Sequence, residues 1–201
     1  MDTEFNRQRV ALRRRTAHDQ FMSDAIQQAA AAEIAKHRRL LRSGRDGRIL
    51  SALMFPLLRW APQAGYGVLT TTGRKTGKPR HKCVRVIRRG DRAHLVALRP
   101  PHLAVERPTA TQAWVHNIRA NPKVGLRLRG GTFEGIAREI TDEDEREQAR
   151  SALCETFYLG DYGECALHLR GLPTRTKVQE LHRYWFETGI PVVIDLKETT
   201  P

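Results

Sequence analysis

The stretch that begins at Tyr66 alternates β-branched and polar residues between glycine-containing turns, and this pattern constrains the fold more than any other feature. Strand-like segments of this kind occupy residues 67–72, 83–88, 93–98, 123–129 and 132–140. Gly90 and the pair Gly130-Gly131 stand at connections where a positive φ is needed. Residues 190–196 predict a closing strand. We therefore expect two hairpins within a set of mostly antiparallel strands.

Helix-forming composition and helical spacing predict helices around these strands. They occupy residues 7–41, 111–120, 141–157 and 177–186. Thr111 is the expected cap of the second helix, and residues 141–144 form an acidic, capping-box-like start for the third. No strand–helix–strand alternation accompanies the hairpins. The sequence therefore predicts an α+β fold, in which a small barrel of mostly antiparallel strands carries peripheral helices.

The N-terminal arm is basic and differs in composition from the rest of the chain. Ser43-Gly44 and Asp46-Gly47 are expected to end its helix, which contains few large apolar residues. The sequence therefore predicts two parts, a helical arm over residues 1–48 and a barrel domain over residues 49–201. We expect the arm to lie on the barrel or dimer surface. Oligomer contacts and an anionic membrane surface are the alternatives.

The net charge of +13 makes polyanions the expected partners. Nucleic acid, anionic lipid and a cofactor with phosphate or carboxylate groups satisfy this expectation equally, and a solvated basic surface is the alternative. The acidic, then arginine-rich start lacks the apolar core of a secretory signal. The apolar run over residues 49–58 is too short to cross a bilayer. We expect a cytoplasmic protein, with peripheral membrane association through the arm as an option.

Residues 73–80, Gly-Arg-Lys-Thr-Gly-Lys-Pro-Arg, join two predicted strands and are dense in cations. Such a turn can direct backbone N–H groups, a hydroxyl and cationic side chains toward one anion. It is not a Walker loop, because its glycines are one residue too close and Pro79 stands where magnesium binding requires Ser or Thr. An ordinary exposed basic turn is the alternative. The residues therefore predict an anion-binding turn without naming its ligand.

With its flanks, this turn closely resembles the signature of the deazaflavin-dependent nitroreductase family of split β-barrel oxidoreductases. The resemblance rests first on residues 69–80, Leu-Thr-Thr-Thr-Gly-Arg-Lys-Thr-Gly-Lys-Pro-Arg. Later features follow in the family's order: the hairpin at Gly90-Asp91, residues 113–124, the Gly130-Gly131 hairpin, the acidic helix start at Thr141 and residues 190–193. The resemblance covers about residues 66–196 and is weakest between residues 154 and 188. It implies a split β-barrel of the FMN-binding type.

The resemblance implies coenzyme F420 as the cofactor, with its phosphate- and glutamate-bearing tail against the basic turn. The positions that match the family's tail-binding residues are Arg74, Lys75, Thr76, Lys78 and Arg80. Lys82 is a further candidate for a phosphate contact. Trp114 and Asn117 match a Trp-x-x-Asn motif that helps to shape the cofactor site. The alternative for Trp114 is a purely structural role in the core.

The resemblance also implies that reduced F420 donates a hydride to a small or lipophilic acceptor, such as a quinone, an enone or a nitro compound. Tyr158, Tyr162 and Tyr184 lie where the family builds its substrate pocket, and a phenol could donate a proton there. Ordinary packing is the alternative for each. A homodimer with cofactor grooves near the interface is also implied. We expect no metal site, because the histidines and three cysteines show no ligand spacing.

Two departures from the family pattern leave alternatives open. Residues 98–102, Leu-Arg-Pro-Pro-His, are bulkier than the small, glycine-containing segment of the relatives. After Arg80, His81-Lys82-Cys83 stand where relatives usually place a proline. These changes are compatible with FMN, FAD or haem in place of F420, or with a loss of redox activity. A non-catalytic module that binds anionic membrane or nucleic acid is the third candidate; nucleic acid is the less favoured ligand, because aromatic residues are few and no recognised motif is present.

Overall fold

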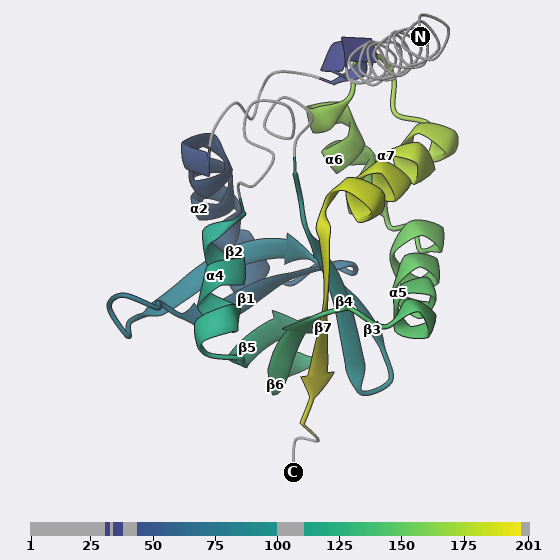
Figure 1. The fold of residues 1–201 in the computed structure, drawn as a ribbon. Helices are drawn as coiled ribbons and strands as arrows, with labels where there is room; N and C mark the ends of the chain where they lie inside the picture. Colours follow the sequence, from purple (N-terminus) through teal and green to yellow (C-terminus); the bar gives the residue numbers. More distant parts are fainter. Residues whose placement is uncertain (1–30, 33, 38–43, 100–110, 198–201) are drawn as a thin grey trace, which may run out of the picture. The chain divides into compact units, whose positions relative to one another are not determined.

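The computed structural model describes residues 31–32, 34–37, 44–99 and 111–197 (Figure 1). The chain divides into two compact units, residues 1–37 and 38–201. In the first unit, residues 31–32 and 34–36 are helical, and the rest of the predicted arm falls largely outside the described residues. All elements from α2 to β7 belong to the second unit. The predicted domain boundary after residue 48 lies within α2 (Gly44–Trp60) and stays a prediction.

The second unit is built on one seven-stranded antiparallel sheet with the order β2-β1-β5-β6-β7-β4-β3. Its strands are β1 (Tyr66–Thr72), β2 (Pro79–Arg85), β3 (Ile87–Arg89), β4 (Arg92–Ala97), β5 (Lys123–Leu128), β6 (Gly131–Glu139) and β7 (Ile190–Leu196). Side chains alternate between the two faces, as in β5, where Val124, Leu126 and Leu128 are buried and the residues between them are more exposed. This alternation is the pattern that the sequence showed.

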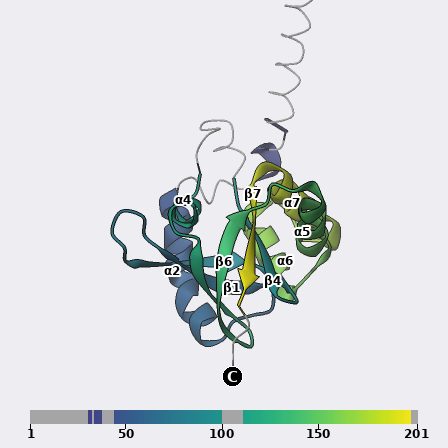
Figure 2. The ribbon, with the colours of Figure 1, turned by 60° about the horizontal axis from the view of Figure 1, so that its bottom comes forward.

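The two outer strands of the sheet are consecutive stretches of one chain segment, because only Val86 separates β2 from β3. The first stretch pairs with β1 and the second with β4. At the junction, the Val86 amide donates a hydrogen bond of 2.8 Å to the Gly65 carbonyl. The sheet therefore curls back on itself into a barrel (Figure 2). This architecture confirms the predicted α+β split β-barrel with peripheral helices.

Helices cover the barrel on two sides. They are α2, α4 (Ala113–Ala120), α5 (Glu143–Glu155), α6 (Leu159–His168) and α7 (Arg175–Thr188). Figures 1 and 2 both show α2 and α4 on one side of the strands and α5, α6 and α7 on the other. Within the described ranges, no helix is long and apolar enough to cross a bilayer.

Three of these helices match the sequence predictions, and their first residues show how they start. Asp142 caps α5 by accepting a 2.9 Å bond from the Glu145 amide. Gln112, rather than the predicted Thr111, takes the N-cap position of α4, and its side chain bonds elsewhere. Helix α6 was not predicted, and α2 contains Gly44 and Gly47, which were expected to stop a helix.

The main apolar core fills the barrel and is closed by α4. Its most deeply buried members include Leu69, Leu95, Val115, Leu126, Val192 and Ile194. A second cluster packs α5 and α7 on the outside of the sheet, and a third lies between α6 and α7. Each fully buried aliphatic side chain of this kind contributes roughly 1.5–3 kcal/mol. The barrel is therefore a packed scaffold on which α4 and the β1–β2 connection are positioned.

Candidate functional site

The basic turn, residues 73–78, connects β1 to β2 and is held by its own backbone. The Gly73 amide donates to the Lys78 carbonyl at 2.9 Å, and the Gly77 amide donates to the Gly73 carbonyl at 2.7 Å. Gly77 has a φ of 65°, a conformation that side-chain-bearing residues rarely adopt. A Cβ on Gly73 would lie 3.0 Å from the Thr76 Oγ1 and 3.1 Å from the Lys78 carbonyl oxygen. The two glycines therefore set the shape of the turn.

Asn117 fixes this turn to α4. Its side chain is buried, its Nδ2 donates to the Thr71 Oγ1 at 3.0 Å, and its Oδ1 accepts from the Arg74 amide at 3.2 Å. One amide side chain thus bonds the end of β1 and the first cation of the turn. Asn117, the last residue of the Trp-x-x-Asn motif, therefore lies where it can orient the basic turn.

The five predicted tail-binding residues lie together on this turn and at the start of β2. Their side chains are exposed: Arg74, Lys75, Thr76, Lys78 and Arg80. In the part of the chain that the structure describes, no carboxylate forms an ion pair with these cations. The Thr76 Oγ1 accepts from Arg80 Nη2 at 3.4 Å and from the Lys78 amide at 3.4 Å. The arrangement offers four cations and a hydroxyl to an anion outside the fold.

Lys82 extends this cationic set along β2. Arg80, Lys82 and Val84 lie on one face of the strand, because successive side chains alternate. Val84 packs against the barrel core, so this face is the inward one. Lys82 is half-buried, and burial lowers the pKa of its ammonium group. Its position therefore continues the basic turn toward the barrel interior.

Trp114 is buried in the barrel core and is part of a hydrogen-bonded chain that the sequence did not reveal. Its Nε1 donates to the Gln112 Oε1 at 2.7 Å, and the Gln112 Nε2 donates to the Leu98 carbonyl at 2.7 Å. These contacts support the structural role that was the alternative for Trp114. They also fix the first residue of the 98–102 segment; residues 100–102 of that segment lie outside the described residues.

The three candidate tyrosines are distributed over the other helical side. Tyr158 precedes α6, Tyr162 lies within it, and Tyr184 lies in α7. All three are partly exposed and pack against the second or third apolar cluster. Figure 2 shows α6 and α7 across the barrel from α4. The structure thus places the tyrosines apart from the basic turn, and their role as proton donors stays a prediction.

A buried ion pair joins the barrel to α6. Asp161 in α6 accepts from Arg85 Nε at 3.0 Å, from the Tyr66 hydroxyl at 2.9 Å and from the Tyr158 amide at 2.7 Å. Arg85 also donates to the Leu153 and Thr156 carbonyls at 2.9 and 2.8 Å. Burial opposes ionisation of Asp161, but the bonds from Arg85 hold its pKa below the usual value. The pair therefore ties β1, β2, α5 and α6 together.

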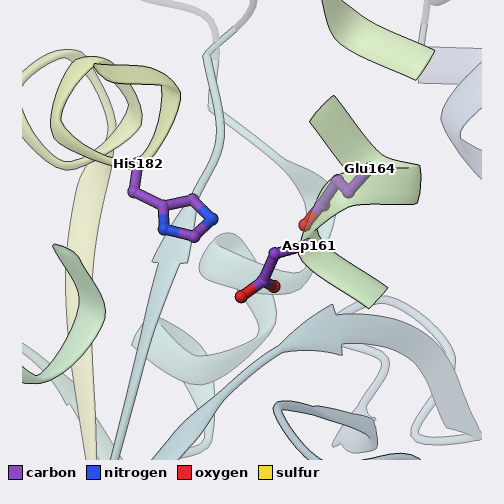
Figure 3. A group of neighbouring side chains, drawn as sticks. All are labelled: Asp161, Glu164 and His182. Atoms are coloured by element: carbon purple, nitrogen blue, oxygen red, sulfur yellow. The ribbon is translucent and has the colours of Figure 1, made fainter. Parts of the chain in front are cut away.

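Glu164 and His182 lie near Asp161, as Figure 3 shows. The Tyr66 hydroxyl lies 2.7 Å from Glu164 Oε2, and burial raises the pKa of that carboxyl group. Burial and the charge of Arg85 lower the pKa of His182 to about 3, so its ring is neutral. Its Nδ1 is buried and has no hydrogen-bond partner among the described residues. This group could not be predicted from the sequence, because folding brings His182, Tyr66 and Arg85 to Asp161 and Glu164 from distant parts of the chain.

Asp161, Glu164 and His182 offer potential metal-ligand atoms within 4.8 Å of one another, the one such group in the described ranges. The Asp161 oxygens already accept from Arg85, Tyr66 and the Tyr158 amide. A divalent cation bound there would face the Arg85 guanidinium at close range, which is electrostatically unfavourable. The geometry suits a structural polar cluster, and the expectation that the chain has no metal site stays a prediction.

A family model described as F420H(2)-dependent quinone reductase matches residues 58–164 of the chain. This range is just over half of the chain. It contains β1 to β6, the basic turn, α4 and α5. The basic turn, Lys82, Trp114 and Asn117 therefore all lie inside the matched region.

Several solved structures resemble the chain at low sequence identity. An F420-H2 dependent reductase is 23% identical, with 67% of this chain and 95% of that chain covered and a TM-score of 0.44. The heme storage protein HutZ from Vibrio cholerae is 12% identical, with coverages of 74% and 92% and a TM-score of 0.41. A heme binding protein from Mycobacterium smegmatis is 14% identical, with coverages of 70% and 48% and a TM-score of 0.43. From the extent of the family match, the chain belongs to the F420H2-dependent quinone reductases and is an F420-dependent reductase.

Proposed function

We propose that this protein uses F420H2 to reduce a small or lipophilic acceptor, such as a quinone, an enone or a nitro compound, by hydride transfer. The observation that supports the proposal most strongly is the basic turn, with its exposed cations and its attachment to α4 through Asn117. Family membership gives the reductase class. The acceptor and the form in which the electrons are transferred are part of the proposal.

The residues of the turn fit the tail of F420, which carries a phosphate and carboxylates. Arg74, Lys75, Lys78 and Arg80 offer cationic donors without carboxylate partners in the described part of the chain, and charge-assisted hydrogen bonds are the strong ones. When bound, F420H2 supplies a hydride from its ring system. Asn117 would keep the Arg74 amide oriented. Lys82 would add a cationic contact to the tail closer to the barrel interior. In this proposal the residues of the chain bind the F420 tail and orient the cofactor.

A proton must accompany the reduction of the acceptor, and Tyr158, Tyr162 and Tyr184 are the candidates to donate it. Each is partly exposed, so each phenol has access to solvent. Their helices, α6 and α7, lie across the barrel from α4 (Figure 2). In this proposal the turn holds the tail, and the proton comes from the opposite helical side or from water.

We also propose that the protein is a homodimer, as the family resemblance implies. The chain mass is 22.9 kDa, so light scattering coupled to size-exclusion chromatography separates the two states clearly. A mass of a single chain at micromolar concentration would contradict this part of the proposal. That result would not contradict the proposed reductase activity.

The activity is tested by anaerobic oxidation of F420H2 in the presence of a quinone, followed as the return of F420 absorbance. We expect oxidation to depend on both the protein and the acceptor. The absorption spectrum of the purified protein tests the alternative cofactors. A stoichiometric flavin or haem spectrum, with no oxidation of F420H2, would favour FMN, FAD or haem and would contradict the proposal.

A further inference from the structure

Helix α2 carries an exposed apolar stripe on its outer side. The stripe consists of Ile49, Leu53, Leu57 and Trp60, whose exposed fractions are 60%, 76%, 46% and 80%. Spacings of four, four and three residues place these side chains on one face of the helix. Among the described residues, the other large exposed hydrophobic side chains lie in or after α6. The stripe is therefore the main concentration of exposed apolar surface on this side.

The opposite face of α2 is already used by the barrel. Leu58 is buried, and the Ser51 Oγ accepts from the Cys83 amide at 2.9 Å. The Phe55 ring lies 5.2 Å from the His81 ring on β2. A helix that is apolar on both faces is normally buried on both. The barrel covers only one face of α2. The exposed apolar stripe on the other face therefore indicates an interaction site for an apolar partner.

The stripe has an exposed cation beside it and no carboxylate within its own segment. No acidic residue occurs between residues 49 and 60, and Arg59 is exposed in the last turn of the helix. The Arg59 guanidinium lies 5.9 Å from the centroids of the Phe55 and Trp60 rings. This arrangement places a positive charge directly beside apolar and aromatic side chains.

Helix α2 packs against β2, the strand that follows the basic turn. Ser51 contacts Cys83 and Phe55 contacts His81, so α2 and β2 run in opposite directions. An apolar stripe with aromatic and cationic residues at one end is typical of helices that lie in a membrane interface.

We propose that α2 binds the surface of an anionic membrane, with Ile49, Leu53, Leu57 and Trp60 inserted at the acyl boundary and Arg59 at the phosphates. Charge favours a lipid surface over a second copy of the chain. A two-fold dimer through this stripe would bring the Arg59 residues of two chains of charge +13 close together, whereas anionic lipids neutralise them. The inserted element is α2, not the N-terminal arm, and its binding needs no cofactor.

Trp60 provides a direct reporter of insertion. The chain has three tryptophans, and Trp114 and Trp185 are 6% and 4% exposed, so Trp60 alone faces the surroundings. We would mix the full-length protein with vesicles of phosphatidylcholine, with or without phosphatidylglycerol, whose acyl chains carry bromine. We expect quenching by the anionic vesicles and little by the neutral ones. The quenching should disappear in Trp60→Phe, because bromine quenches only tryptophans that it approaches closely.

Two leucine substitutions distinguish the stripe from exposed leucines in general. Leu53→Glu places a carboxylate in the middle of the stripe, and Leu172→Glu does the same at an equally exposed leucine, 83% exposed, that follows α6. We expect Leu53→Glu to weaken partitioning to anionic vesicles at least about tenfold, because the new charge must enter the interface. Leu172→Glu should leave it unchanged. Thermal melts check that both variants are folded.

Three results would overturn the proposal. The first is unchanged vesicle binding by folded Leu53→Glu. The second is sedimentation with anionic vesicles without bromine quenching of Trp60, which would assign the contact to another part of the chain. The third is a wild-type protein that does not bind vesicles and a Leu53→Glu variant that is monomeric where the wild type is dimeric. That result would show that a second copy of the chain covers the stripe.

Discussion

Asn117 illustrates how a single side chain in a helix sets the geometry of a turn that lies more than 40 residues earlier in the sequence. Its amide satisfies the Thr71 hydroxyl on one side and the Arg74 amide on the other. The Asn117 side chain is buried where it makes both bonds. Loss of these bonds therefore costs free energy, because water does not readily replace the buried amide as a partner. The orientation of Arg74 at the start of the basic turn therefore depends on α4.

We predict that Asn117→Ala weakens F420 binding about tenfold and destabilises the fold by about 1–3 kcal/mol, because the buried Thr71 hydroxyl and the Arg74 amide lose their partner. The measurements are F420 fluorescence quenching and denaturant unfolding. Thr71→Val is the matched variant, since it removes one bond and leaves the bond to Arg74. It should lower stability with a smaller effect on binding. Equal F420 affinity in wild type and Asn117→Ala would refute the positioning role.

His182 makes the stability of the fold depend on pH. Its pKa is lowered from the usual value near 6.5 to about 3, mainly by burial. Between these two values the unfolded chain takes up a proton that the folded chain does not. The contribution of His182 to the free energy of unfolding is therefore fully present above its pKa in the unfolded chain. It falls as the pH drops below that value, by about 1.4 kcal/mol per pH unit at most. His94 is also buried with a lowered pKa and acts in the same direction.

We predict that His182→Phe flattens the loss of stability between pH 6.5 and 4. Phenylalanine keeps the ring contacts with Phe157 and Trp185 and leaves no polar partner behind, since Nδ1 has none in the described structure. The free energy of unfolding is measured by urea titration across this range. The slope should decrease without vanishing, because His94 remains. A variant with the wild-type slope would show that His182 is not protonated on unfolding in this window.

At the scale of elements, the strands were predictable because their glycine turns and alternation are local features. Residues 83–88 were nevertheless expected to form one strand, and the structure divides them between β2 and β3 at Val86. The division follows from pairing with β1 on one side and β4 on the other. Such partners are distant in the sequence, so the closure of the barrel could not be derived from the local pattern.

Helix α6 was missed because Gly160 and Gly163 lower its helix propensity by about 1 kcal/mol each relative to alanine. Tertiary contacts outweigh this cost, above all the bonds of Asp161 to Arg85 and Tyr66. Gly160 has a further role. A Cβ at this position would lie 2.7 Å from Cε2 of Tyr66, whose hydroxyl is held by Asp161 and Glu164. The glycine thus permits the close approach of α6 to β1.

We predict opposite effects for the two glycines of α6. Gly160→Ala should destabilise the fold by about 1–3 kcal/mol, because the anchored Tyr66 ring cannot move without losing its bonds. Gly163→Ala should stabilise it by about 0.5–1 kcal/mol, because a Cβ there meets nothing within 4 Å. Chemical denaturation measures both. Stabilisation by both alanines would show that Tyr66 does not constrain the approach of α6.

At the scale of the whole chain, the two sides of the barrel have different roles. The basic turn, α4 and the apolar stripe of α2 lie on one side (Figure 2), whereas α5, α6 and α7 lie on the other, where the buried ion pair joins Arg85 of β2 to Asp161 of α6. The cations of the basic turn could be grouped from the sequence because they are nearly contiguous in it, and their role in tail binding stays a prediction. The Gln112 bonds and the Tyr66, Arg85 and Asp161 contacts could not, because they join segments that only folding brings together.

In the proposed function, the basic turn binds the anionic tail of F420. The most direct test is the dissociation constant of F420 for the double variant Lys75→Ala, Arg80→Ala, measured by fluorescence quenching. The control is Arg129→Ala, an exposed cation in the β5–β6 hairpin near the opposite end of β1 from the turn. We predict that the double variant raises the dissociation constant on the order of 100-fold, with the control unchanged. Unchanged affinity in the double variant would contradict the account and place the tail elsewhere.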